Sequence, residues 1–61
     1  MLSLLIIDDH PLVGEGISRM LVDLNYLQVT GICKNAAEAI SFLEKETADI
    51  ILLDISLPDM D

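Results

Sequence analysis

The chain has 61 residues and a formal net charge of −8, with eleven Asp and Glu residues against three Lys and Arg residues. This acidic balance excludes a basic phosphate-binding surface, so we do not expect residues 1–61 alone to bind nucleic acid. The hydrophobic content of 52% is too high for a disordered acidic segment. The single cysteine excludes an internal disulfide and an all-cysteine zinc site. The sequence therefore predicts one small folded unit without the usual covalent or zinc reinforcement.

The N-terminal apolar run does not have the features of a targeting segment. Residues 4–7 are apolar, but no basic residue precedes them and two aspartates follow directly. A signal peptide needs a basic start, and a membrane-spanning helix needs about 20 apolar residues. We therefore expect a reducing, cytoplasmic setting and no membrane association.

The first third of the chain predicts a strand followed by a helix. Residues 2–7 are nearly all apolar and stop abruptly at Asp8, which is typical of a strand buried on both faces of a parallel sheet. Pro11 suits a first helical turn. An apolar stripe at three- and four-residue steps follows, made of Val13, Ile17, Met20, Leu21 and Leu24. We expect a left-handed helix end at Asn25 and a core position for Met20.

The rest of the chain predicts a second strand, a second helix and a third strand. Residues 27–33 are rich in β-forming side chains. Asn35 and Glu38 form a capping-box pattern, and the helix stripe behind them consists of Ala36, Ala39, Ile40 and Leu43. Residues 50–53 are the purest apolar run and predict a third strand buried on both faces. The order βαβαβ with right-handed crossovers predicts a doubly wound parallel α/β sheet.

Four further residues are interpreted as structural. Gly14 and Gly16 weaken their helix, and we expect them to allow close packing on the sheet. Cys33 ends an apolar strand and is predicted to be a small buried hydrophobic residue, not a reactive thiol. Phe42 is predicted to lie in the core.

Three carboxylates carry the chemistry that the sequence indicates. Asp8 and Asp9 follow the first strand, and Asp54 follows the third. Because the carboxyl ends of parallel strands meet at one edge, these acids converge if the two strands are neighbours. Oxygen ligands of this kind suit Mg²⁺, and a carboxylate beside Mg²⁺ can accept a phosphoryl group. Without a cluster of His and Cys residues we do not expect zinc, and His10 is interpreted as a loop residue near the acids.

Both acidic segments resemble those of a known family. Residues 5–13 (Leu-Ile-Ile-Asp-Asp-His-Pro-Leu-Val) resemble the opening of response-regulator receiver domains of two-component signalling, in the NarL/LuxR-type subfamily. Residues 49–61 (Asp-Ile-Ile-Leu-Leu-Asp-Ile-Ser-Leu-Pro-Asp-Met-Asp) resemble the phosphoacceptor segment of the same family. The resemblance covers essentially the whole chain. It implies a flavodoxin-like (CheY-like) fold with the strand order 2-1-3 in this part.

The resemblance also implies the site and its partners. Asp54 would accept a phosphoryl group from a sensor histidine kinase. Mg²⁺ would be held by side-chain oxygens of Asp9 and Asp54, by the backbone carbonyl of Ser56, and by Asp8 through a water. Such a module assists its own phosphorylation but is not an enzyme in the usual sense. Members of the subfamily usually end in a LuxR-type helix-turn-helix, so the full-length protein would be a DNA-binding transcriptional regulator.

We expect residues 1–61 to be the N-terminal half of a receiver domain. The family's switch Ser or Thr after strand four and its Lys after strand five have no counterpart in the sequence, so we expect slow or absent phosphorylation of this chain alone. The order 2-1-3 would leave residues 50–53 as an unpaired apolar edge, and such an edge recruits another strand. We therefore expect either self-association through two-fold pairing of that strand with its copy, or a larger parent protein of which residues 1–61 are a portion.

Two alternatives stay open at this point. A corrinoid-binding module on the same fold carries Asp-x-His-x-x-Gly after its first strand, but here the glycine of residues 8–14 comes one position late and Asp54 has no role. The other alternative is an acidic interaction fragment whose carboxylates only cap helices. Replacing Asp9 and Asp54 by Asn separates the readings, because relief of repulsion stabilises a clustered site whereas loss of caps destabilises helices.

Overall fold

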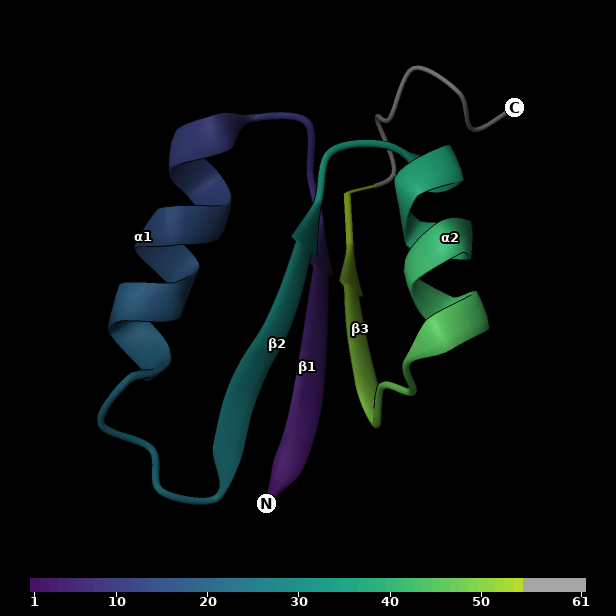
Figure 1. Ribbon diagram of the computed structural model, residues 1–61. Coiled ribbons are helices and arrows are strands. Elements are labelled where there is room, and N and C mark those ends of the chain that lie inside the picture. Colours follow the sequence, from purple (N-terminus) through teal and green to yellow (C-terminus); the bar gives the residue numbers. More distant parts are fainter. Residues whose placement is uncertain (55–61) are drawn as a thin grey trace.

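The structure is a computed structural model that describes residues 1–54. This part of the chain forms a three-stranded parallel sheet that lies between two helices (Figure 1). In chain order the elements are β1 (Leu2–Ile7), α1 (Pro11–Leu21), β2 (Leu27–Cys33), α2 (Ala36–Lys45) and β3 (Ile50–Leu53). The sheet order is β2-β1-β3. The predicted βαβαβ arrangement and strand order 2-1-3 are confirmed.

The pairing of the strands brings the ends of β1 and β3 to the same level. In the parallel ladder of β1 and β3 the register runs from Leu4 opposite Ile50 to Ile7 opposite Leu53. The ladder of β1 and β2 contains one irregularity, where Thr30 is the extra residue in β2. Asp8 and Asp54, the residues directly after β1 and β3, therefore both lie at the carboxyl edge of the sheet, as parallel strands require.

The core is centred on β1, because this strand has a neighbour on each side. Its last four residues have exposed fractions of 5% or less. Cys33 and Ala39 are also buried, and the partly buried Phe42 packs against this core from α2. The buried Cys33 and the partly buried Phe42 both belong to the core, as the sequence predicted.

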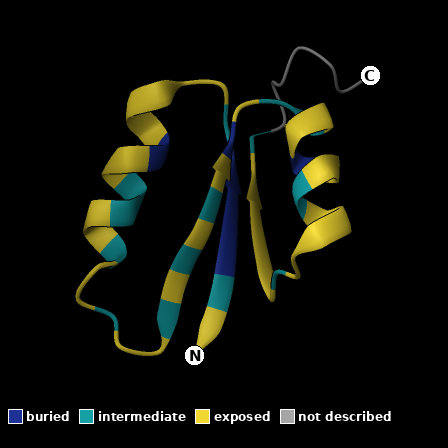
Figure 2. Cartoon of the chain, in the orientation of Figure 1, coloured by how far each residue is buried: buried dark blue, intermediate teal, exposed yellow. Residues whose placement is uncertain are grey.

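Strand β3 is where the predicted burial is wrong. All four of its side chains are between 41% and 46% exposed, whereas the sequence predicted burial on both faces (Figure 2). The physical reason is position: among the described residues, β3 pairs only with β1 and lies at the edge of the sheet. An apolar sequence shows that a strand can be buried, but neighbouring elements decide whether it is.

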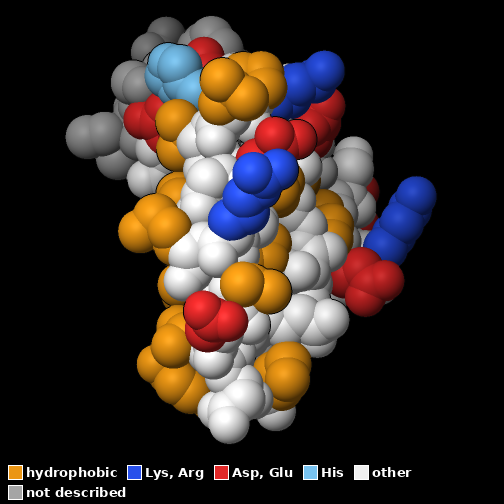
Figure 3. Space-filling view, turned by 90° about the vertical axis from the view of Figure 1, so that its left-hand side faces the viewer, with side chains coloured by type: hydrophobic (Ala, Val, Ile, Leu, Met, Phe, Trp, Pro, Cys, Tyr) orange, Lys and Arg blue, Asp and Glu red, His pale blue; other side chains and the backbone are white. Residues whose placement is uncertain are grey.

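Helix α1 ends earlier than predicted. It stops at Leu21, Val22 is right-handed, and no non-glycine residue in the described part of the chain has a positive φ, so Asn25 is not a left-handed cap. The amide of Leu24 donates to the carbonyl of Leu21 at 3.0 Å, a tight i+3 bond of the kind that closes helix ends. Met20 is 79% exposed, so its predicted core position is wrong. Figure 3 views the molecule from the side on which α1 lies and shows apolar side chains scattered among charged ones there.

The two glycines of α1 differ in their surroundings. A Cβ on Gly14 would lie 2.7 Å from the side chain of Ile32, so close packing of α1 on β2 requires a glycine there, as predicted. A Cβ on Gly16 would meet nothing within 4 Å, so packing does not explain this glycine. Close packing was therefore a correct prediction for only one of the two.

Helix α2 begins at the predicted cap. The Asn35 side chain accepts a hydrogen bond from the amide of Glu38 at 2.8 Å. The Glu38 carboxylate accepts in turn from the amide of Lys34 at 3.0 Å, one residue before the position that a standard capping box uses. Ala39 of the predicted stripe is buried, but Ile40 is 61% exposed, so only part of that stripe faces the core.

Ser3 and Asp49 join the opposite, amino-terminal ends of β1 and β3. The amide and the hydroxyl of Ser3 donate to Oδ2 of Asp49 at 2.8 and 3.1 Å. The amide of Asp49 donates back to the backbone carbonyl of Ser3 at 3.0 Å. The two hydrogen bonds that Ser3 donates hold the pKa of Asp49 below its ordinary value of 3.8, because they stabilise the carboxylate. The contact fixes the start of β3 beside β1.

Candidate phosphoacceptor and metal site

The carboxyl ends of β1 and β3 bring the predicted acids together. Asp8 and Asp9 follow β1, and Asp54 follows β3. The amide of Asp8 donates to the carbonyl of Cys33 at 2.8 Å, and the amide of Asp54 donates to the carbonyl of Ile7 at 2.9 Å. These bonds extend the sheet by one residue on each strand. Asp9 and Asp54 therefore meet although 45 positions separate them in the sequence.

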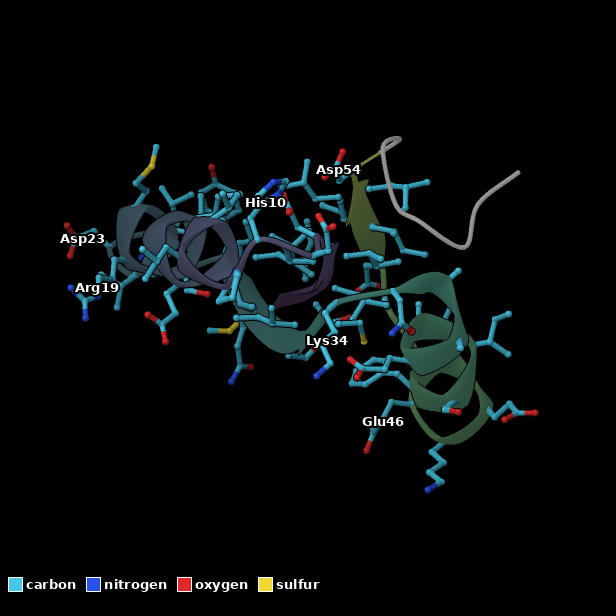
Figure 4. All side chains as sticks on the ribbon, turned by 90° about the horizontal axis from the view of Figure 1, so that it is seen from above. His10, Arg19, Asp23, Lys34, Glu46 and Asp54 are labelled. Atoms are coloured by element: carbon cyan, nitrogen blue, oxygen red, sulfur yellow. The ribbon has the colours of Figure 1, made fainter. Side chains whose placement is uncertain are left out.

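The imidazole of His10 lies among all three carboxylates. Its Nδ1 is 2.8 Å from an oxygen of Asp8, 3.1 Å from one of Asp9 and 3.7 Å from one of Asp54. Oδ1 of Asp8 also accepts the backbone amide of His10 at 2.9 Å, which holds the loop in a tight turn. One ligand atom from each of the four residues fits within 4.8 Å of the others. Figure 4 shows His10 and Asp54 side by side at this edge.

The acids perturb the titration of His10. Its pKa is raised from the ordinary 6.5, first because the ring hydrogen-bonds to Asp8 and then because of the charges of Asp9, Asp8 and Asp54. A protonated imidazole is a cation, and three carboxylates favour it electrostatically. The three carboxylates thus attract a cation, and the protonated ring of His10 is one such cation.

The acids lie at a shallow, water-accessible rim. The side chains of Asp8 and Asp54 are 15% and 20% exposed, while Asp9 and His10 are more open at 39% and 64%. A hollow of about 260 Å³ adjoins Asp8 and Asp54 between the ends of β1 and β3. A larger hollow of about 690 Å³ between α1 and β2 includes none of the acids of the cluster, so its size does not make it the better site.

The donor set fits a divalent cation. Three carboxylates supply the oxygen ligands that Mg²⁺ prefers, and an accessible rim leaves room for the waters that Mg²⁺ usually keeps. The cluster does not look like a set of helix caps. The N-cap of α1 is His10, and no side chain caps this helix. Capping alone therefore does not explain why these acids are placed together.

The structure brings together most of the residues that the sequence singled out. Asp8, Asp9 and Asp54 lie in one cluster, as expected from neighbouring parallel strands. Ser56, the predicted source of a backbone carbonyl, lies outside the described residues. His10 is in a loop near the acids, as predicted, but its ring contacts all of them and has a larger place in the site than the sequence suggested. Its position directly after two aspartates was the available signal.

Comparison with known proteins identifies the family. The model of the response regulator receiver domain family matches residues 4–61, and the chain belongs to this family. Receiver domains are phosphoacceptors of two-component systems that work with sensor histidine kinases and bind Mg²⁺ at an acidic phosphorylation site. The assignment favours the receiver interpretation over a corrinoid-binding module.

Individual relatives agree with this assignment. The chain is 38% identical over 58 residues to the response regulator GacA of Pseudomonas syringae pv. syringae, which covers 95% of this chain and 27% of that protein. RcsB of Salmonella enterica serovar Typhimurium, solved on the promoter rprA with the phosphomimetic BeF3⁻, superposes with a TM-score of 0.88 at 31% identity, over 95% of this chain and 47% of that one. A LuxR-family response regulator from Aurantimonas sp. SI85-9A1 gives 0.88 at 30% identity, over 98% and 43%.

The match to these relatives covers only part of the length of each. The chain spans about a quarter of the length of the curated relatives it matches, so the activities and partners of the whole proteins do not transfer directly. Within residues 1–54, neither helix has the length and apolar character needed to cross a membrane.

Proposed function

We propose that Asp54 is the phosphoacceptor and that Asp8 and Asp9 bind Mg²⁺ beside it. The supporting observation is the meeting of these three acids at the carboxyl ends of β1 and β3, in a chain of the receiver family. Asp9 and Asp54 would bind the ion directly, the backbone carbonyl of Ser56 would add an oxygen, and Asp8 would act through a water. The bound ion would neutralise charge on the carboxylates and on the incoming phosphoryl oxygens.

The reaction is a transfer between two side chains. A carboxylate oxygen of Asp54 forms a bond to the phosphorus of a phosphohistidine on a sensor kinase. The bond between that phosphorus and the histidine nitrogen breaks, and the nitrogen keeps the electron pair and takes up a proton. Asp54 is 20% exposed at the rim of the cluster, which leaves its carboxylate within reach of a donor.

We further propose that residues 1–61 are the N-terminal half of a receiver domain in a longer, cytoplasmic transcriptional regulator. The curated relative GacA is about three and a half times as long as this chain, and the structural relative RcsB was solved bound to a promoter. DNA binding would be the work of another part of that protein, since the net charge of this part is −8.

The transfer is tested by mass spectrometry with a small phosphoryl donor. Phosphoramidate and Mg²⁺ are incubated with the chain, with Asp54→Asn, and with the matched control Asp23→Asn, whose acid lies on the far side of α1 from the cluster (Figure 4). We expect slow, Mg²⁺-dependent gain of one phosphoryl group in the wild type and the control, and none in Asp54→Asn. Labelling of Asp54→Asn at the wild-type rate would contradict the assignment.

We also propose that in residues 1–61 alone, without the rest of the longer protein, the exposed edge of β3 pairs with the β3 of a second copy. Among the described residues this strand has a neighbour on one side only, and its four apolar side chains are more than two-fifths exposed. An apolar edge with free backbone groups is a template for another strand. The high negative charge opposes the pairing, so added salt should favour it.

Light scattering after size exclusion tests this pairing. We expect a dimer whose fraction rises with protein and salt concentration, and a shift to monomer in Ile51→Lys, because a charge on the edge strand discourages pairing. The control is Leu12→Lys, which places the same charge on the exposed outer part of α1. A wild-type chain that stays monomeric at all concentrations would refute the pairing.

A further inference from the structure

The hollow between α1 and β2 is separate from the acid cluster. It has a volume of about 690 Å³ and is lined by the end of α1, the loop that follows this helix, and β2. Figure 1 shows this loop at the end of the sheet where the strands begin, away from the acids. Pockets that hold small molecules have volumes of about 300–1,000 Å³, so the hollow is large enough for such a ligand.

The lining of the hollow carries no charged side chain. None of the described residues that line it is Asp, Glu, Lys, Arg or His, although 23% of the chain is charged. Most of them are apolar, and three of these, Met1, Val22 and Ile32, are each more than two-fifths exposed. The net charge of −8 also disfavours an anion. The hollow therefore suits a neutral, largely apolar molecule that would cover these exposed side chains.

A hydroxyl in the lining lacks a hydrogen-bond partner. The Oγ atom of Ser18 is shielded from solvent and makes no hydrogen bond with any described residue. Buried polar groups in folded proteins almost always have a partner, so a ligand that brings a hydrogen-bonding group to this hydroxyl is favoured. The serine side chain has a single torsion, so its hydroxyl can turn toward such a group while the helix stays in place. Asn25, Gln28 and Thr30 line the same hollow and offer further polar groups.

We propose that this hollow is a binding site for a neutral, largely apolar small molecule that carries a hydrogen-bond acceptor for the hydroxyl of Ser18. The apolar part of the ligand covers the exposed side chains of the lining, and its acceptor satisfies the hydroxyl. Binding holds α1 against β2, because the ligand contacts both elements. The site shares no residue with the acid cluster, so its test is independent of the proposed function.

Fluorescence titration with Nile red tests the proposal, because this neutral, apolar dye carries a carbonyl acceptor and brightens when it leaves water. The variant is Ser18→Leu, which removes the hydroxyl and places a larger side chain in the hollow. The matched control is Ser41→Leu, the same exchange at an exposed position of α2. A single methylene in an apolar pocket changes recognition by about 10–200-fold, so we expect Ser18→Leu to weaken dye binding at least about tenfold. Ser41→Leu should bind the dye like the wild type.

A second pair of variants changes only exposed side chains, so that a loss of binding is not a loss of the fold. Val22→Lys places a charge in the lining of the hollow, whereas Met20→Lys places the same charge at an exposed position outside that lining. A lysine near the C-terminal end of a helix is favourable, so both variants should keep the far-UV circular dichroism of the wild type. We expect Val22→Lys to weaken dye binding and Met20→Lys to leave it unchanged.

NMR spectra of the wild-type chain locate the dye. We expect Nile red to shift the amides of Ser18, Leu24 and Thr30 and to leave those of Asp8 and Ile51 unmoved. Shifts centred on β3 instead would overturn the proposal, as would equal dye affinity in the wild type, Ser18→Leu and Val22→Lys. Absence of saturable binding by the wild type would also overturn it. None of these results alters the test of Asp54 as the phosphoacceptor.

Discussion

Strand β3 is flanked by two aspartates with opposite surroundings. Asp49, before the strand, accepts hydrogen bonds from the amide and hydroxyl of Ser3. Asp54, after the strand, faces Asp8, Asp9 and the ring of His10. An aspartate thus lies at each end of this four-residue strand. One has hydrogen-bond donors beside it, and the other has further acids beside it.

The contrast shows how a structural acid differs from a functional one. Donors on the protein already satisfy the carboxylate of Asp49, and the lowered pKa of Asp49 reflects this. The three acids at the other end lie close to one another and to the ring of His10. Acids that lie close to one another, like these three, are therefore the better candidates for a binding site.

Removing the acid at the structural end should have the larger effect on stability. Asp49→Ala deletes the acceptor of two Ser3 hydrogen bonds, so we expect a clearly lower urea midpoint of unfolding. Glu46→Ala is a control on a neighbouring exposed acid. If Asp49→Ala unfolded at the wild-type midpoint, the contact between the amino-terminal ends of β1 and β3 would not stabilise the fold.

Removing an acid at the functional end should have a smaller effect of opposite sign. Without divalent ions, at low salt and at a pH above the raised pKa of His10, Asp9→Asn relieves repulsion among three carboxylates without losing an ion pair. We therefore expect a gain of about 0.2–1 kcal/mol, the range of exposed charge pairs. Mg²⁺ should cancel or reverse the gain, because the wild type then profits from the extra ligand. A loss of stability without metal would instead support a structural role for Asp9.

The two ends should also respond to different pH ranges. The pKa of His10 is raised, so its stabilising contribution is complete below about 6.5 and is lost as the pH rises through the higher pKa of the folded state. The pKa of Asp49 is lowered, so its contribution is present above about 3.8 and is lost as the pH falls through the lower pKa of the folded state. Urea midpoints measured across pH should lose the neutral-to-alkaline slope in His10→Gln and the acid slope in Asp49→Asn. Unchanged slopes would contradict the two assignments.

The local elements were predictable from the sequence because short-range patterns determine them. The apolar run of residues 50–53 matches β3, and the Asn35 cap marks the start of α2. The meeting of Asp9 with Asp54 also followed, since parallel strands share one carboxyl edge. The order of the strands came from the family resemblance and not from periodicity.

What was missed depends on contacts that the sequence does not display. Ser3 and Asp49 are 46 positions apart, and no local pattern links them. The ring of His10 is placed by the turn that its own amide makes with Asp8. The apolar stripe of α1 does not show where the helix ends or which of its residues face the sheet. Met20 was therefore predicted to lie in the core, although it is exposed.

An NMR titration with Mg²⁺ tests most directly whether the two ends of β3 differ in function. We predict saturable shifts of the amides of Asp8, Asp9 and Asp54, with the amides of Ser3 and Asp49 unmoved. Asp9→Asn should weaken the response, and Asp23→Asn should leave it as in the wild type. Shifts of equal size at both ends of the strand, or no shift at Asp9 and Asp54, would contradict the assignment of the acid cluster as the cation-binding phosphoacceptor site.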